Sequence, residues 1–248
     1  GTRNIAIGVN AYDDSDTEND NVAIGYNAMT TNTAGGTGNT VIGNYAGDAI
    51  TSGDKNILIG HQAGTDVNGG NGQTLIGYDV GTAYTTAANN TAIGHLAGDG
   101  HNGDNCTSIG YNATPSAGDS NNQFVLGDAN ISDLRCADQS IAALSDGRDK
   151  TDVIDLPYGL DFINQTRPVQ FKWDKRNPLE NDSKNGKTHN GFIAQELLAL
   201  GNNQQHRLVL EDNPDKLEAK YSHLLPMMVK AIQELSAEVD ALKAKLKD

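Results

Sequence analysis

Asn56-Ile57-Leu58-Ile59-Gly60 is one copy of a pattern that recurs through the first half of the chain. In each copy a short apolar run ends on a glycine, and successive glycines stand 17, 18, 17, 17, 17, 16 and 17 residues apart. A period this constant predicts one structural rung per repeat, stacked on the next. The glycines are Gly8, Gly25, Gly43, Gly60, Gly77, Gly94, Gly110 and Gly127.

The apolar runs are too short to form a core alone. Runs such as Val22-Ala23-Ile24 are interpreted as strands with two inward apolar side chains each, so several rungs must stack before a face is buried. The glycines are predicted to mark tight corners. The residue before most strands is Asn or Gln, which can satisfy backbone groups at turns or form ladders between rungs. These residues are Asn4, Asn21, Asn39, Asn56, Asn90, Gln73 and Gln123.

The period and the Asn/Gln-x-x-Ile-Gly pattern resemble the parallel β-roll heads of trimeric autotransporter adhesins, although the repeat here is longer and irregular. The resemblance implies a mainly β shaft over residues 1–130, a trimeric β-roll or β-helix-like stack of rungs. Polar loops such as 13–20, 68–73 and 99–105 are predicted to be solvated corners of this shaft. The alternative is that they contact a host cell-surface receptor or glycan.

Leu144-Ser145-Asp146-Gly147-Arg148-Asp149-Lys150 follows a connector, residues 131–144, that lacks the repeat. A serine hydroxyl becomes a nucleophile when a base removes its proton, and a neutral lysine amine can be that base. Five residues of α-helix turn by about 500°, which separates the two side chains, so the pair needs a turn, and Gly147 permits one. The alternative is a polar linker with solvated charges.

Three further segments give this stretch a context: Pro168-Val169-Gln170-Phe171-Lys172-Trp173, Gly191-Phe192-Ile193-Ala194-Gln195-Glu196-Leu197 and a C-terminal helix. Together they resemble the endosialidase-type intramolecular chaperone domain of phage tailspikes and tail fibres, a self-cleaving serine peptidase. The resemblance implies that residues 145–248 drive trimerisation of the shaft and then cut themselves off between Leu144 and Ser145. Ser145 would be the nucleophile and Lys150 its general base, with no cofactor and no metal.

The neighbours of Lys150 bear on this role, because a lysine base must lose its proton. Asp146 and Asp149 would raise its pKa by pairing with it, unless Arg148 draws their charge away. Burial of Lys150 at a subunit contact would favour the neutral amine. We therefore expect cleavage to wait for assembly.

The rest of the C-terminal half is predicted to be an α+β domain. We expect a turn and short helix within 153–163, a strand at 169–173, a loop over 174–190, a strand entry at 191–193 leading into a helix, and a strand at 208–210. The segment 224–248 is predicted to be a helix with a heptad seam, which suits a coiled coil or docking on neighbouring subunits. Ile or Val at a with Leu at d favours two strands, whereas the family implies three. The seam is Met228, Ile232, Leu235, Val239, Leu242 and Leu246.

Composition excludes some classes of partner. The formal net charge of −14 argues against binding to nucleic acid or to an anionic membrane surface. Cys106 and Cys136 are too few for a disulfide framework and lack metal spacing, so both are predicted to be free thiols. No signal peptide or membrane-spanning run is visible. With the resemblance, this predicts a virion tail fibre assembled in the host cytoplasm.

Three functions are therefore compared. The preferred one is a phage tail fibre or tailspike segment whose chaperone trimerises the shaft and then releases itself by a single autoproteolytic cut. The second is a non-cleaving trimeric adhesin with a C-terminal trimerisation foot, in which exposed tyrosines of the shaft stack on sugars. The third, a general protease acting on other proteins, lacks a recognisable substrate cleft or oxyanion motif.

Overall fold

The computed structural model describes residues 1–15, 17–32, 35–137, 141–174 and 186–247. It divides them into two compact units, Gly1–Ile131 and Ser132–Asp248. The first unit is a parallel β-solenoid, and the second is a small mixed unit that ends in a long helix. This arrangement confirms the predicted fold class, whereas threefold association of the chain remains a prediction.

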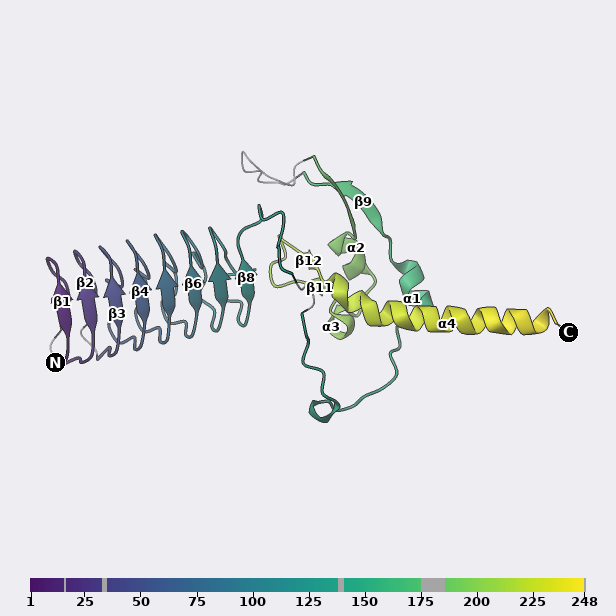
Figure 1. The fold of residues 1–248 in the computed structure, drawn as a ribbon, viewed down its shortest axis with the longest axis horizontal. Helices are drawn as coiled ribbons and strands as arrows, with labels where there is room; N and C mark the ends of the chain where they lie inside the picture. The colour runs from purple at the N-terminus through teal and green to yellow at the C-terminus, as the bar shows by residue number, and fades with distance from the viewer. Residues whose placement is uncertain (16, 33–34, 138–140, 175–185, 248) are drawn as a thin grey trace. The chain divides into compact units, whose positions relative to one another are not determined.

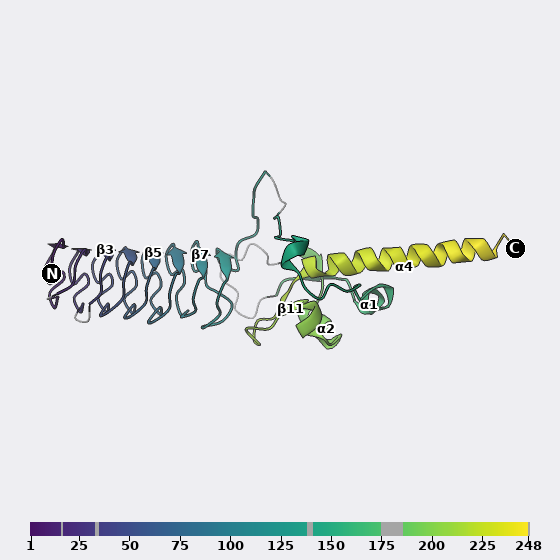
Figure 2. The same cartoon turned by 90° about the horizontal axis from the view of Figure 1, so that it is seen from below.

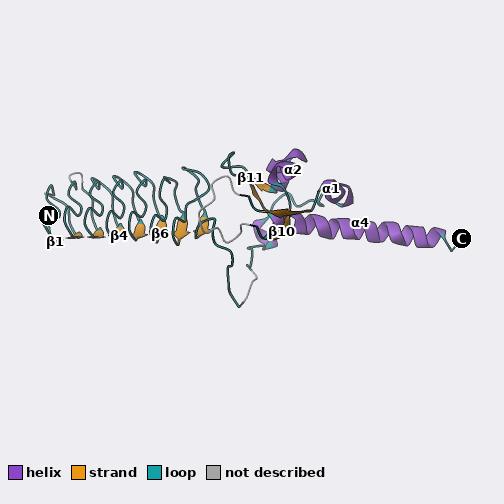
Figure 3. Cartoon of the chain, turned by 90° about the horizontal axis from the view of Figure 1, so that it is seen from above, coloured by secondary structure: helices purple, strands orange, loops and turns teal. Residues whose placement is uncertain are grey.

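The repeats form one parallel sheet of eight three-residue strands, joined in sequence order. Neighbouring strands pair in register, so that each repeat sits directly on the one before it. Figure 1 shows this succession of rungs, and Figure 3 shows that the strands line one side of the coil while loops form the rest. The strands are β1 Ile5–Ile7, β2 Val22–Ile24, β3 Thr40–Ile42, β4 Ile57–Ile59, β5 Thr74–Ile76, β6 Thr91–Ile93, β7 Thr107–Ile109 and β8 Phe124–Leu126.

Each inner strand buries one side chain, and the prediction of two inward side chains per strand was wrong. In β2–β7 the middle residue is buried and the two flanking residues are more exposed. Side chains of a strand alternate between its two faces, so three residues place one side chain inside and two outside. Loop residues fill the remaining interior, among them the alanines three positions after the glycines. The solenoid core includes Ala28, Ala46, Ile50, Ala63, Val67, Val80 and Ala97.

The glycine that ends each strand stands at a corner, as predicted. Gly60 has a φ of +138°, in a region that side-chain-bearing residues rarely adopt. A Cβ at this position would collide with the carbonyl oxygen of Gly77 in the next rung. Glycine is therefore required here both by backbone conformation and by close packing between rungs.

The predicted ladder of Asn and Gln side chains is confirmed. Asn56 is fully buried, and its Oδ1 accepts a hydrogen bond from the backbone N–H of Gln73 at 2.9 Å. Its Nδ2 donates to the carbonyl oxygen of Gly70 at 2.8 Å. Asn39 makes the same two bonds one rung earlier, to Asn56 and Gly53. The ladder therefore satisfies backbone groups that the narrow interior hides from water.

The interior becomes more polar towards the C-terminal rungs. Tyr84 and His101 are buried with their rings 5.8 Å apart, and Ser108 is the buried middle residue of β7. Tyr84 Oη, His101 Nδ1 and Ser108 Oγ are buried without a hydrogen-bond partner of good geometry among the described residues. Burial raises the pKa of the Tyr84 phenol and lowers the pKa of His101. This end of the core is therefore poorly satisfied. Cys106 lies nearby as a buried free thiol, and Cys136 is exposed on the surface.

The second unit packs short elements around the first turns of a long helix. Leu197, Leu208, Val209, Leu224 and Met227 form its buried core. Strands β9 and β10 pair antiparallel, as do β11 and β12. The elements are η1 Gly147–Asp149, α1 Leu160–Gln165, β9 Val169–Lys172, β10 Thr188–Gly191, α2 Ala194–Ala199, α3 Asn203–His206, β11 Val209–Leu210, β12 Glu218–Ala219, η2 Tyr221–His223 and α4 Leu224–Lys245.

Two predicted boundaries in this unit were displaced. The short helix begins at Leu160, where Glu234 of α4 accepts a hydrogen bond from the Leu160 N–H at 2.7 Å. Of the loop predicted over 174–190, residues 175–185 lie outside the described residues. Its last part belongs to β10, because pairing with β9 extends the strand back to Thr188. The described residues of 137–144 contain no regular element, and Asp138 and Gln139 lie outside them.

Helix α4 carries two apolar faces. Leu224, Met227 and Ala231 are buried. The heptad positions of the seam from Met228 to Leu246 are all exposed, by between 39% and 87% of each residue. Figure 2 shows α4 extending well beyond the other elements of its unit. The seam therefore stays exposed among the described residues of a single chain.

Candidate active site

Ser145 and Lys150 meet directly. The Nζ of Lys150 donates a hydrogen bond to Ser145 Oγ at 2.6 Å and a second to the Ser145 carbonyl oxygen at 3.2 Å. This distance is within the reach expected of a nucleophile and its base. The structure thus brings together the two residues that the sequence singled out, within six consecutive positions of the chain.

A short 3₁₀ turn produces this contact. Asp146 caps η1, because its Oδ1 accepts a hydrogen bond from the Arg148 N–H at 2.9 Å. The N–H of Lys150 then donates to the Gly147 carbonyl oxygen at 3.3 Å, which closes the turn. Gly147 does not have a left-handed conformation, and a Cβ there would meet open space. The predicted turn is present, but it does not depend on the conformational freedom of glycine.

Arg148 holds the carboxylate nearest to the pair. Its Nη2 donates to Asp146 Oδ2 at 2.6 Å, and its Nε lies 3.1 Å from both carboxylate oxygens. Hydrogen bonds from this side chain lower the pKa of the Asp146 carboxyl. Asp146 is therefore engaged by Arg148, while the hydrogen bonds of Lys150 go to Ser145. The pairing of Arg148 with Asp146 is the contact expected if Arg148 is to draw the charge of Asp146 away from Lys150.

The whole segment is exposed in a single chain. Residues 141–150 all lie on the surface, and Leu144 is as open as in an extended chain, at 105% exposure. Among the described residues of unit 2, none removes water from the Lys150 amine or shields the peptide bond before Ser145. The hydrogen bond between Ser145 and Lys150 is thus formed in the single chain, where the Lys150 amine is exposed to water and is not yet buried.

Glu196 and His189 make contacts away from the Ser145–Lys150 pair. Arg167 binds the Glu196 carboxylate through both Nε, at 3.0 Å, and Nη2, which lowers the pKa of Glu196. The ring of His189 stacks on Phe171 at 6.0 Å across the β9–β10 pair. Both contacts hold structural elements together, so neither residue has a visible part in the chemistry.

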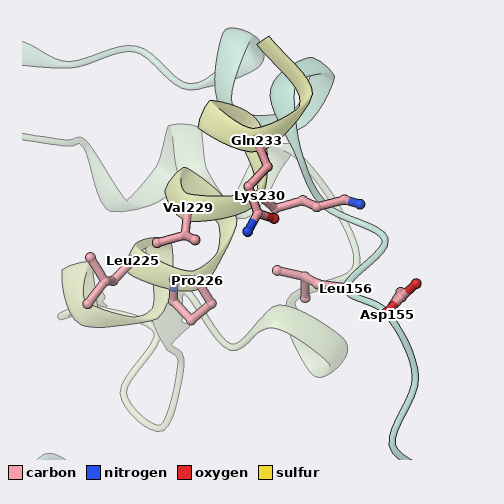
Figure 4. Close-up of a pocket in the computed structure, with 7 residues that line it drawn as sticks. All are labelled: Asp155, Leu156, Leu225, Pro226, Val229, Lys230 and Gln233. Atoms are coloured by element: carbon pink, nitrogen blue, oxygen red, sulfur yellow. The ribbon is translucent and has the colours of Figure 1, made fainter. Parts of the chain in front are cut away.

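An open groove of about 660 Å³ lies beside the segment that follows Lys150. Leu156 faces Pro226 and Lys230 of α4 across it, and Leu225 and Val229 continue its apolar wall (Figure 4). The sequence did not reveal this groove, because it arises from contact between residues 155–156 and a helix about seventy residues later. Its apolar side continues onto the exposed surface of α4.

Comparison with known families gives a match to part of unit 2. Residues 145–204 match the family described as Chaperone of endosialidase, peptidase S74. The match begins at Ser145, and this segment is an endosialidase-type chaperone domain. Such a domain behind a β-solenoid shaft fits a phage tail protein, and the family points to self-cleaving serine peptidase activity in general. No curated protein and no solved structure gave a match.

Within the described ranges, no three His, Cys, Asp or Glu side chains gather as ligands for a metal ion. In the same part of the chain, no helix has both the length and the apolar character needed to cross a membrane.

Proposed function

We propose that residues 145–248 are an intramolecular chaperone that trimerises the chain, guides folding of the solenoid shaft and then cuts the bond between Leu144 and Ser145. The observation that carries this proposal is the 2.6 Å hydrogen bond between Lys150 Nζ and Ser145 Oγ, at the first residue of the family match. The product is a mature tail fibre or tailspike shaft. In the alternative function the chain is not cut, and the loops of the shaft contact a host receptor or glycan.

The cut begins when the neutral amine of Lys150 takes the proton of Ser145 Oγ. The oxygen attacks the carbonyl carbon of Leu144, and the tetrahedral centre collapses with cleavage of the C–N bond. The leaving nitrogen becomes the free amino group of Ser145, and it accepts a proton from the lysine. This N-to-O acyl shift leaves an ester between Leu144 and Ser145 Oγ. Water then hydrolyses the ester and separates the two chains.

Assembly of the trimer buries the amine of Lys150, which is exposed in the single chain. A hydrated lysine ammonium is only a hydrogen-bond donor, and burial favours the neutral amine that can act as a base. The exposed seam of α4 is the surface through which three copies of unit 2 associate, and the exposed segment 141–150 becomes covered in that assembly. Cleavage therefore follows trimerisation and does not precede it.

Denaturing gels and intact mass test the proposal. Wild-type protein is expected to give two fragments, residues 1–144 and 145–248, whereas Ser145→Ala and Lys150→Ala leave one chain of 26.2 kDa. Ser132→Ala is the matched control, because Ser132 is an exposed serine of the same unit, and it should cleave like the wild type. If wild type and Ser145→Ala give the same single band after assembly, the chain is a non-cleaving fibre with a trimerisation foot.

A further inference from the structure

The ladder of buried side-chain amides is interrupted at Cys106, the residue before β7. From Asn21 to Asn90, the amide oxygen of each ladder residue accepts the backbone N–H of the next one. The amide nitrogen donates to a backbone carbonyl oxygen of the adjoining rung. Cys106 has a single sulfur for both contacts, and Sγ lies 3.5 Å from the Gln123 nitrogen and 3.3 Å from the Ser120 carbonyl oxygen. A thiol is a weak donor and a weak acceptor, so the ladder is weakest between the rungs of β7 and β8.

The polar groups left unsatisfied in the shaft core lie in the same region. Among the described residues of the shaft, the buried side-chain atoms without a hydrogen-bond partner of good geometry belong to Tyr84, His101 and Ser108. Ser108 occupies the inward position of β7, which Val41 fills with an aliphatic side chain in β3. None of residues 116–131 is buried. Each unsatisfied group favours an open state in which water reaches it.

We propose that residues 101–131 open and close as a local unit while the rungs of β2 to β5 stay folded, and that Cys106 and Ser108 cause this weakness. In a stack of repeats each rung contacts only its neighbours, so one end can open without unfolding the rest. This opening is a property of the shaft and does not require the cut. The part of the inference that rests on the function proposed above is its consequence: the chaperone is joined to the end of the shaft that closes least readily.

The position of these rungs at one end of the sheet is a competing cause of opening. Both ends of a stack lack a neighbouring rung and fray more easily than its middle. At the other end, however, Asn21 makes both amide bonds, to the Asn39 N–H and to the Gly36 carbonyl oxygen, each at 2.8 Å. The inward position of β2 is held by Ala23, which has no polar group to satisfy. The two ends therefore offer an internal comparison within one molecule.

Amide hydrogen exchange in the full chain tests the inference, with Ser145→Ala in every sample so that the chain stays whole. The Thr91 N–H donates to the Cys106 carbonyl oxygen and the Val22 N–H to the Asn39 carbonyl oxygen, both at 2.8 Å. Each bond joins the second pair of strands from an end of the sheet. The Thr91 N–H is expected to exchange at least about tenfold faster than the Val22 N–H, the effect of losing about one buried hydrogen bond.

Two substitutions separate the proposed cause from simple fraying. Cys106→Asn restores the ladder amide, and Ser108→Ala removes a hydroxyl from a position that alanine already fills in β2 and β6. Each should slow exchange at Thr91 several-fold and leave Val22 unchanged. Cys136→Ser is the control, because it replaces an exposed cysteine outside the shaft, and it should change neither rate.

Equal exchange at Thr91 and Val22 in the Ser145→Ala chain would overturn the inference. Faster exchange at Thr91 that neither substitution slows would also overturn it, because fraying of the end would then be sufficient. If Cys106→Asn does not fold, Ser108→Ala decides alone. A denaturing gel of the chain with Ser145 intact reports the cut separately. An uncut chain with fast, correctable exchange at Thr91 would refute the proposed function and leave this inference standing.

Discussion

Replacing the buried ladder residue Asn56 by alanine should destabilise the shaft strongly. The change removes the acceptor of the Gln73 N–H and the donor to the Gly70 carbonyl, which lie 2.9 and 2.8 Å from the Asn56 side chain. Asn56 is 0% exposed, so water does not replace either bond. Each orphaned buried group costs about 1–3 kcal/mol, and Asn56→Ala should therefore lower the free energy of unfolding by about 2–6 kcal/mol.

The assay is equilibrium unfolding in guanidinium followed by far-ultraviolet circular dichroism, at fixed protein concentration because association contributes to stability. Ser145→Ala is included in every sample so that the chain stays whole. Asn71→Ala is the matched control, because Asn71 makes a similar bond to the Asp54 N–H at 2.7 Å but is exposed. Its loss should cost less than about 1 kcal/mol, since water replaces it. Equal costs for the two variants would refute the role assigned to the buried ladder.

Further variants test the corner, the core and the turn. Gly60→Ala should prevent soluble shaft from forming, because the new methyl group meets the Gly77 carbonyl oxygen. A folded Gly60→Ala shaft on size exclusion would contradict the role of this corner. Gly147→Ala should leave folding and cleavage unchanged, because its methyl group would meet open space. Tyr84→Phe should change the unfolding free energy by less than about 0.5 kcal/mol or raise it, since Oη has no hydrogen-bond partner of good geometry among the described residues; a clear loss would show that Oη is well bonded. Arg148 lowers the pKa of Asp146, so their pairing is present above the range where free aspartate titrates and is lost as pH falls through the lowered pKa. Above that range Asp146 is ionised, so Arg148→Ala frees its carboxylate to pair with Lys150, and cleavage measured there should be slower than in the wild type.

The period of the sequence was sufficient to predict the shaft. Gly60 and Asn56 are each required by contacts with the adjacent rung. Because every rung makes the same contacts, the same residue types recur in each repeat and can be recognised in the sequence. The same reasoning placed Ser145 and Lys150 together, because a turn of six residues is a local structure. The sequence did not correctly predict how many side chains of each strand point into the core. A three-residue strand can place either one or two side chains inside, and the tertiary structure decided that the middle residue faces the core.

The sequence alone determined the elements whose contacts are local or repeated: the stacked strands, the corners, the Asn ladder and the serine–lysine pair. Only the tertiary structure decided which faces are left open. Glu196 is committed to Arg167, the groove beside Leu156 forms against α4, and the strand face and heptad seam remain exposed. The reason is physical: the apolar pattern of a strand or helix shows that a face must be buried, but not whether its own chain or another covers it.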